Sequence, residues 1–406
     1  MDKKILFSAF VIFFTIFFKF DLLNPTFVGW LSNGLILSFL LVNFPIFKGI
    51  FSGEYKCVNI LGIIWLSIIL YSGYENQNLN YDDETWDGVV LESMSSMRFD
   101  HVIYYSLKFF LCILYYQYLS TIKKGSIFLD YFFRLMLIYA AVSDINALFY
   151  NSVDGSGYLI GNKFYVCYVN LFVVTLYYFR NPLLEGKSKI KMKTLLFVSF
   201  IIAIRTQCST VVVGTLLMYF FAIRLKGHLR LRLYDWKTYL LGLGIFDFLF
   251  FFFTMSFIDN PIMKFIIVDL LGEDMTLTGR LDIYAALGGL LSECPLYGFG
   301  VGNAHLMTMM FGIGPNAQNG FFNYMLEVGL FGIIVFLFFL FLLMKKATKY
   351  NGTYAVICFI YVMLILSSIE VTFTTYFFAM TLLLLINNEK SVKNVVYEKY
   401  LNSATL

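Results

Sequence analysis

Long apolar runs, separated by short polar or charged stretches, make up most of the chain. A helix of roughly 20 apolar residues is long enough to cross the hydrocarbon core of a bilayer. The pattern therefore predicts about twelve membrane-spanning helices joined mostly by short loops. The predicted spans cover residues 5–19, 27–47, 57–74, 102–122, 127–150, 163–179, 194–205, 210–224, 238–258, 329–344, 353–369 and 371–387.

Two neighbouring runs, 194–205 and 210–224, are short for full crossings and can form either one bent helix or a hairpin. Basic residues both precede and follow the pair: Lys187, Lys189, Lys191, Lys193, Lys226, Arg230, Arg232 and Lys237. Positive charge concentrates on the cytoplasmic side of membrane proteins. Both flanks are then cytoplasmic, which favours a hairpin whose tip lies at residues 205–210.

The composition points to the same class of protein. Hydrophobic residues make up 59% of the chain and charged residues 14%, whereas soluble domains carry about 25% charged residues. We expect an all-α, polytopic integral membrane protein that forms a single transmembrane domain over residues 1–406. Twelve spans with both termini in the cytoplasm place most basic residues inside. The acidic loop 75–101 and the long loop 259–328, between the ninth and tenth spans, then lie outside.

The cysteines, histidines and acidic residues show neither a disulfide pattern nor a metal-binding motif. The six cysteines are scattered without a CxxC motif, although a disulfide between Cys208 and Cys294 is conceivable. No H-E-x-x-H or regular acidic motif is present, so we expect neither a metal nor another cofactor. No nucleic-acid partner is expected either.

Several ionisable residues fall inside predicted spans, where they are usually paired or functional. Lys108 and Asp144 lie at similar depths in sequential spans and are expected to pair. Asp130 and Arg134 are four residues apart on one helix and can also pair, with Asp247 as another partner for Arg134. Because these groups form two separate layers, we interpret them as structural pairs rather than a proton relay.

The loop 259–328 contains the main polar stretch of the chain. Threonines before Gly279-Arg280 indicate a helix start, and Pro295 is expected to end the helix at the membrane surface. Free N–H groups at such a start, together with Arg280, suit an anion. Arg280 can equally be a snorkelling side chain that contacts lipid headgroups.

Two further features of the loop have competing interpretations. The glycines of Gly298-Phe-Gly300-Val-Gly302 resemble a phosphate loop, but no βαβ pattern surrounds them, so a tight turn with close helix approach is favoured. His305 is one of three histidines in the chain. It is either an incidental loop residue or a base or phosphate ligand.

Taken together, these motifs resemble the superfamily of Wzy-type polysaccharide polymerases and O-antigen ligases. An arginine, a P-x-x-G-x-G turn, a His-Asn pair and an E-x-G-x-x-G helix entry occur there in this order. The corresponding residues here are Arg280, Pro295, Gly298, Gly300, Gln318, Asn319, Glu327, Gly329 and Gly332. Arg205, at the hairpin tip, resembles a second arginine of the family.

The resemblance implies a metal-independent glycosyltransferase of the bacterial cytoplasmic (inner) membrane. It would polymerise polyprenyl-pyrophosphate-linked oligosaccharide units into O-antigen or capsule at the outer face, with a flippase and a chain-length regulator as partners. Arg205 and Arg280 would neutralise the pyrophosphate leaving group. The general base would be His305, Glu327 or Glu370. Gly298, Gly300, Gln318, Asn319 and Tyr324 would line the substrate site, with Tyr324 among the aromatics that stack on sugars.

Two alternatives remain at this point. The family's ligases often carry histidine where this chain has Gln318, which favours a polymerase over an O-antigen ligase. A lipid-linked oligosaccharide flippase, a transporter, would also have about twelve spans, but such proteins usually show internal repeats and short outer loops.

Overall fold

The computed structural model describes most of the apolar runs. The described residues are 2–49, 55–81, 94–150, 157–182, 184–225, 227–233, 235, 237–243, 280–312, 316–347 and 353–387. The acidic residues between 82 and 93, the partner Asp247 and most of the predicted span 238–258 therefore lie outside the described part of the chain.

The described chain is almost entirely helical, which confirms the predicted all-α class. The helices are α1 (Asp2–Ile12), α2 (Pro25–Val42), α3 (Lys56–Glu75), α4 (Phe99–Thr121), α5 (Gly125–Phe149), α6 (Lys163–Arg180), α7 (Gly186–Arg205), α8 (Ser209–Tyr219), α9 (Gly227–Leu233), α12 (Arg280–Glu293), α13 (Ala304–Met310), α14 (Gly320–Ala347), α15 (Tyr354–Ser367) and α16 (Thr375–Leu382). Short π or 3-10 segments are η1 (Phe13–Phe17), η2 (Phe44–Gly49), η4 (Phe220–Arg224) and η7 (Leu383–Leu385). Two-residue strands β1 (Asn80–Tyr81) and β2 (Met94–Ser95) pair antiparallel.

Five helices, α2, α3, α4, α5 and α14, are long and apolar enough to cross a membrane. The shorter apolar helices Ser209–Arg224 and Tyr354–Ser367 correspond to the predicted spans 210–224 and 353–369. The chain is therefore a multi-pass membrane protein. The finer count of twelve spans stays a prediction.

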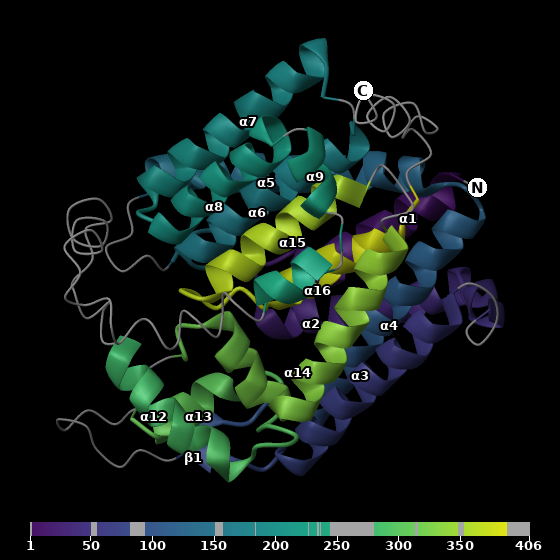
Figure 1. Ribbon diagram of the computed structural model, residues 1–406. Coiled ribbons are helices and arrows are strands. Elements are labelled where there is room, and N and C mark those ends of the chain that lie inside the picture. The colour runs from purple at the N-terminus through teal and green to yellow at the C-terminus, as the bar shows by residue number, and fades with distance from the viewer. Residues whose placement is uncertain are drawn as a thin grey trace, which may run out of the picture.

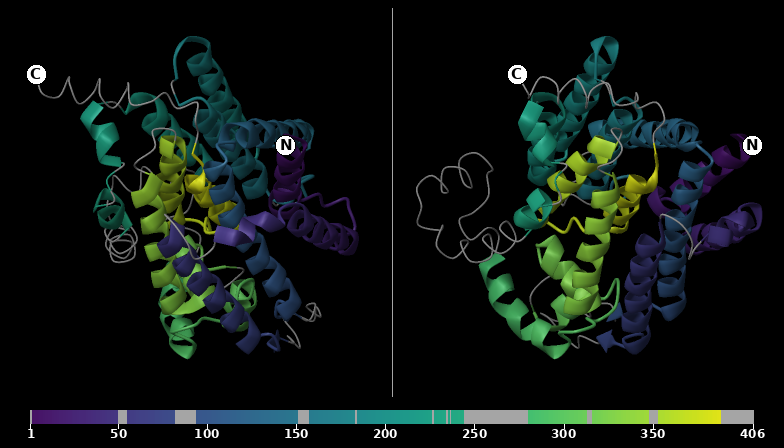
Figure 2. Two further views of the ribbon diagram at one scale, coloured as in Figure 1. Left: turned by 90° about the vertical axis from the view of Figure 1, so that its right-hand side faces the viewer. Right: turned by 45° about the vertical axis from the view of Figure 1, so that its right-hand side comes forward.

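The helices differ sharply in how deeply they are buried. Every residue from Val166 to Phe179 of α6 is buried, and in α15 all but Ile365 are buried. Figure 1 places α15 in the middle of the molecule. Helix α2, by contrast, lies with α1 at one edge (Figure 2), and Leu37 and Leu41 are 60% and 73% exposed.

The hairpin predicted for the two short runs is confirmed. Helices α7 and α8 pack against each other, and a hydrogen bond of 3.1 Å joins the hydroxyls of Ser199 and Thr215 between them. The tip at residues 206–208 lies beside α5, where Arg205 Nε donates to the Leu148 carbonyl at 3.4 Å.

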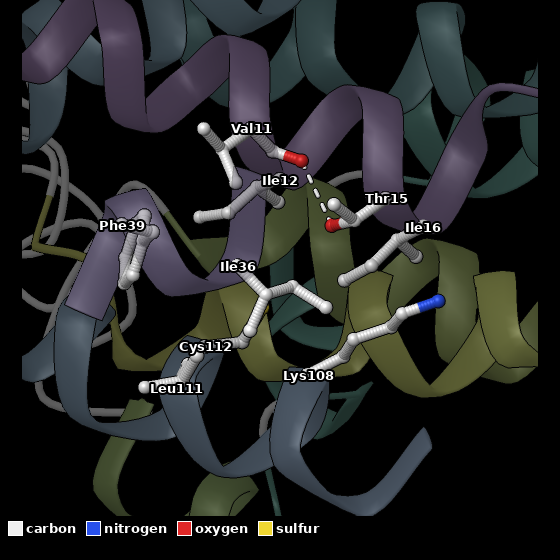
Figure 3. Close-up of a pocket in the computed structure, with 9 residues that line it drawn as sticks. All are labelled: Val11, Ile12, Thr15, Ile16, Ile36, Phe39, Lys108, Leu111 and Cys112. Atoms are coloured by element: carbon white, nitrogen blue, oxygen red, sulfur yellow. Dashed lines mark hydrogen bonds between the residues drawn. The ribbon is translucent and has the colours of Figure 1, made fainter. Parts of the chain in front are cut away.

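The prediction that Lys108 pairs with Asp144 is wrong, and the Arg134–Asp247 alternative lies outside the described residues. Asp130 forms an ion pair with Arg180 of α6, a partner that was not predicted. Asp144 accepts a hydrogen bond from Asn170 of α6 at 2.7 Å, and Lys108 lies against α1 and α2 instead (Figure 3). The reason is tertiary packing: α6 covers the face of α5 that carries both carboxylates and supplies both partners.

Basic residues gather at one end of the bundle. The Asp130–Arg180 ion pair brings the start of α5 next to the end of α6, and Tyr177 of α6 donates to Ser188 O near the start of α7. Lys346, in the last turn of α14, lies over the ring of Tyr55 at the start of α3. The same end therefore carries basic residues from several predicted cytoplasmic segments.

Candidate functional site

The opposite end of the bundle carries most of the residues singled out in the sequence. We call it the α13 end; it comprises the last turn of α3, α12, α13 and the first part of α14 (Figure 1, lower part). A separate hydrophobic cluster holds it together: Ile283, Leu287, Leu290, Phe299, Ala304, Met307, Ala317 and Leu326. Helix α12 begins at Arg280 and ends before Pro295, as predicted.

Two distant motifs are joined at the α13 end by their backbones. We call residues 295–300 and 326–331, and the contact between them, the interlock. Four backbone hydrogen bonds form it: Phe299 N to Leu326 O (2.7 Å), Gly300 N to Glu327 O (2.9 Å), Leu330 N to Pro295 O (2.9 Å) and Phe331 N to Leu296 O (3.1 Å). The glycine-rich turn and the helix entry thus form one structural unit.

Glycine is required on both sides of the interlock. Gly329 has φ 69° and ψ 179° inside α14, a conformation that essentially only glycine adopts. A Cβ there would lie 2.2 Å from Leu296 O, and one on Gly298 would lie 2.6 Å from Leu326 O. The backbone N–H groups of Phe299 and Gly300 donate to α14, so these two groups are not free to bind a phosphate. This agrees with the prediction of a tight turn that lets a helix approach closely.

Polar side chains that the sequence did not single out fasten the interlock to its surroundings. Ser72 of α3 donates to Gly298 O (3.3 Å) and Glu327 O (3.1 Å), and Asn76 donates to Gly298 O at 3.2 Å. Asn303, 2% exposed, accepts from Met97 N at 2.7 Å, which ties the turn to the segment after β2. Serines and asparagines near span ends are common, so nothing in the sequence distinguishes these residues.

Glu327 lies two residues before the Gly329 kink. One carboxylate oxygen accepts a hydrogen bond from Gly302 N at 3.2 Å. The side chain is partly exposed and interacts electrostatically with the hydroxyls of Tyr105 and Tyr324. The carboxylate is therefore fixed by the glycine-rich turn on one side and bordered by tyrosines of the bundle on the other.

Two of the predicted substrate-binding side chains, Asn319 and Tyr324, have structural roles, while Gln318 is described through its backbone. Asn319 is 1% exposed, and its side-chain oxygen accepts from Phe321 N and Phe322 N, so that it caps the start of α14. Gln318 has φ 45°, and its backbone N–H donates to Asn316 Oδ1. Tyr324 is fully buried and accepts a hydrogen bond from Trp65 Nε1 at 2.6 Å. We therefore regard Tyr324 as a core residue and not as a sugar platform.

Three other aromatics of the α13 end are more accessible. Tyr71, Tyr297 and Phe331 are 47%, 39% and 46% exposed. Their rings form a row, with centroids of Tyr71 and Tyr297 4.9 Å apart and those of Tyr297 and Phe331 6.3 Å apart. The interlock holds the last two in place.

The other candidate side chains lie around the same end. His305 is exposed on α13. Glu370, between α15 and α16, is partly exposed and accepts from Val371 N at 3.0 Å, and it interacts electrostatically with Tyr168 of α6. Gly320, at the start of α14, approaches Thr372 in the same connection, so Glu370 lies near the start of α14. The side chain of Arg280 lies outside the described part.

The conceivable disulfide does not form. All six cysteines are free; Cys208 is buried next to Cys167 on α6, and Cys294 donates to Gly298 O at 3.0 Å. Partial burial raises the pKa of the Cys294 thiol. Among the described residues, no group of three His, Cys, Asp or Glu side chains could hold a metal ion.

Comparison of the chain with family models, with curated proteins and with solved structures gives no match. The functional interpretation therefore rests on the sequence motifs and on the geometry of the α13 end.

Proposed function

We propose that the protein polymerises polyprenyl-pyrophosphate-linked oligosaccharide units, and that the α13 end is its active face. The proposal combines the resemblance of the motifs with their arrangement in the fold. The proposed reaction is a glycosyl transfer that needs no metal ion. The alternative functions are that of an O-antigen ligase and that of a lipid-linked oligosaccharide flippase.

The observation that carries the proposal is the interlock. Backbone conformations open only to glycine are costly and cluster at functional sites. Here such a conformation, at Gly329, accompanies a close approach of two backbones and a carboxylate, Glu327, held on the rim of the turn. If residue 327 only packed against its neighbours, it would not need an acidic side chain.

The roles follow from what each group offers. Glu327 is the leading general base for the acceptor hydroxyl, with Glu370 and His305 as further candidates around the same end. Arg205 and Arg280 would stabilise the charge that develops on the pyrophosphate leaving group. The ring row of Tyr71, Tyr297 and Phe331 replaces Tyr324 as the proposed contact for sugar faces or lipid.

The proposed orientation places the α13 end outside the cytoplasmic membrane of a bacterium. The basic residues at the other end of the bundle support it, because positive charge remains in the cytoplasm. The partners in this setting are the carrier-linked oligosaccharide, membrane lipid, a flippase and a chain-length regulator.

Deletion of the gene and gel analysis of the surface glycan tests the proposal. A polymerase requires that the long-chain ladder disappears while a single repeat unit still reaches its acceptor. Loss of the single unit as well would indicate a ligase instead. An intact ladder would overturn both assignments. Complementation with Arg280→Ala should fail to restore the ladder, whereas the wild-type gene restores it.

A further inference from the structure

The start of α7, at the basic end of the bundle, carries four lysines that we call the lysine cluster: Lys187, Lys189, Lys191 and Lys193. Lys187, Lys191 and Lys193 are exposed, and Lys189 is partly exposed. None of the four forms an ion pair or a side-chain hydrogen bond with another described residue. Their charges are therefore available to a ligand.

The lysine cluster does not serve the stability of α7. The start of a helix carries partial positive charge, so lysines in the first turn, here Lys187 and Lys189, are unfavourable. A capping box between Glu185 and Ser188 holds the helix start in spite of them. The orientation of the protein accounts for net positive charge at this end of the bundle, but not for its concentration at the start of one helix.

An exposed apolar stripe follows the cluster along the same helix. Ile190, Phe197, Ile201 and Ile204 are 65%, 64%, 39% and 53% exposed. Their spacings of seven, four and three residues place them on one face of a helix. The opposite face packs into the bundle through the buried residues Met192, Leu196, Ser199, Ile202 and Ala203.

The lysines flank the first residue of the apolar stripe. Because a helix has 3.6 residues per turn, residues four apart lie on nearly the same face. Lys187 and Lys191 therefore lie on one side of Ile190, and Lys189 and Lys193 lie on the other. After Lys193, the next charged residue of α7 is Arg205. One face of α7 thus changes from charged to apolar, as a phospholipid does from its headgroup to its acyl chains.

Both parts of this face lie on the surface of the molecule. Helix α7 lies at the outside of the bundle, at the top of Figure 1. A lysine can keep its aliphatic stem on apolar surface while its amine reaches the level of the headgroups. A lipid that lies along the exposed face of α7 therefore needs neither a cavity nor an entry path.

We propose that this face of α7 binds an anionic phospholipid, with the phosphate held by the lysine cluster and an acyl chain along Ile190 and Phe197. Charge complementarity selects an anionic headgroup, and the apolar stripe favours a lipid over a soluble anion. The face lies at the basic end of the bundle, away from the α13 end, so the proposal does not depend on the reaction proposed above.

Native mass spectrometry of the full chain in detergent micelles tests the site. The protein is titrated with phosphatidylglycerol and, separately, with phosphatidylcholine carrying the same acyl chains. We expect phosphatidylglycerol to bind at least about fivefold more tightly, the equivalent of one lysine that contributes about 1 kcal/mol at the membrane surface. Replacing all four lysines of the cluster by glutamine should remove this preference, and replacing them by arginine should keep it.

A matched variant separates the lysine cluster from general positive charge. Glutamine at four other lysines of the predicted cytoplasmic segments, namely Lys3, Lys4, Lys123 and Lys124, removes the same charge and should leave the preference unchanged. Ile190→Gln interrupts the apolar stripe and should weaken the binding of both lipids. Melting curves without added lipid show which variants fold, and the glutamine variant of the cluster should melt no lower than the wild type.

Three results would overturn the proposal. The first is equal binding of both lipids by the wild-type chain. The second is a loss of preference in the matched variant as large as in the cluster variant, which would assign the preference to general charge. The third is displacement of phosphatidylglycerol by an equimolar amount of inorganic phosphate, which would indicate an anion site to which the acyl chain contributes nothing.

Discussion

The interlock and the α7–α8 tip both carry motifs of the proposed active face, but they are built differently. In the interlock, two backbones touch through glycines and share four hydrogen bonds. At the tip, the chain turns through backbone hydrogen bonds within its own segment, and side chains attach it to neighbouring helices: the Thr206 hydroxyl and the Cys167 thiol lie 3.1 Å apart, and Arg205 Nε makes a 3.4 Å hydrogen bond to Leu148 O.

This difference separates residues that set geometry from residues that supply chemistry. At Gly298 and Gly329 the backbone conformation dictates the residue, so a substitution there changes the fold of the site. At Arg205 the backbone hydrogen bonds of Thr206, Gln207 and Cys208 form the turn, so a substitution of the side chain should mainly remove charge.

The largest effect is expected for Gly329→Ala. The new Cβ would collide with Leu296 O, and alanine is strained at φ 69° and ψ 179°. Strain and broken interlock bonds together should cost about 3 kcal/mol or more. A lower melting temperature in detergent and loss of the glycan ladder are the measurements.

Gly34→Ala is the matched control for this change. Gly34 lies inside α2, and a Cβ there meets nothing within 4 Å. Alanine should be neutral or stabilise the helix by up to about 1 kcal/mol. If both variants melt like the wild type, the interlock does not require glycine. Gly329 would then not be a residue that sets the geometry of the site.

The next largest effect is expected for Glu327→Gln. Glutamine keeps an oxygen for the hydrogen bond from Gly302 N, so the fold and the melting temperature should stay nearly unchanged. General-base catalysis contributes roughly 10²–10⁴ in rate, so chain elongation in membrane vesicles should fall by about that factor. An unaltered elongation rate would reduce Glu327 to a structural acceptor and move the base to Glu370 or His305.

Arg205→Ala should lower elongation by about 10²–10³, the usual effect of removing one donor to a developing anion. The melting temperature should change little, since Thr206 and Cys208 hold the tip. Arg98→Ala removes an arginine that pairs with Asp100 on an exposed surface, and it should leave the rate unchanged. A large drop in stability for Arg205→Ala would place Arg205 among the geometry-setting residues.

How far the sequence predicted this arrangement depends on the kind of contact. Features fixed locally were predicted: the apolar helices, the α7–α8 hairpin, a helix from Arg280 that ends before Pro295, and close approach at the glycine-rich turn. The partners of Asp130 and Asp144 were not, because they come from α6 and depend on how helices pack.

Tyr324 shows a second kind of error. The predicted span began at residue 329, where the helical backbone is interrupted, but a helical segment from Gly320 precedes this break and turns Tyr324 toward Trp65. Residues 320–328 were predicted as part of the loop 259–328 and are helical instead. Asn319 gave the missing signal, because asparagine is among the preferred N-cap residues.

The smallest effects come from two serines, one in each region. Ser72 donates to Gly298 O and Glu327 O in the interlock, and Ser199 shares a hydrogen bond with Thr215 between α7 and α8. Replacing either by alanine removes a buried hydroxyl and should cost about 1 kcal/mol of stability. The two variants should therefore melt alike. Only Ser72→Ala should also slow elongation, by a few-fold, because it loosens the backbone that carries Glu327. Equal rates in both variants would mean that the geometry of the interlock does not limit the reaction.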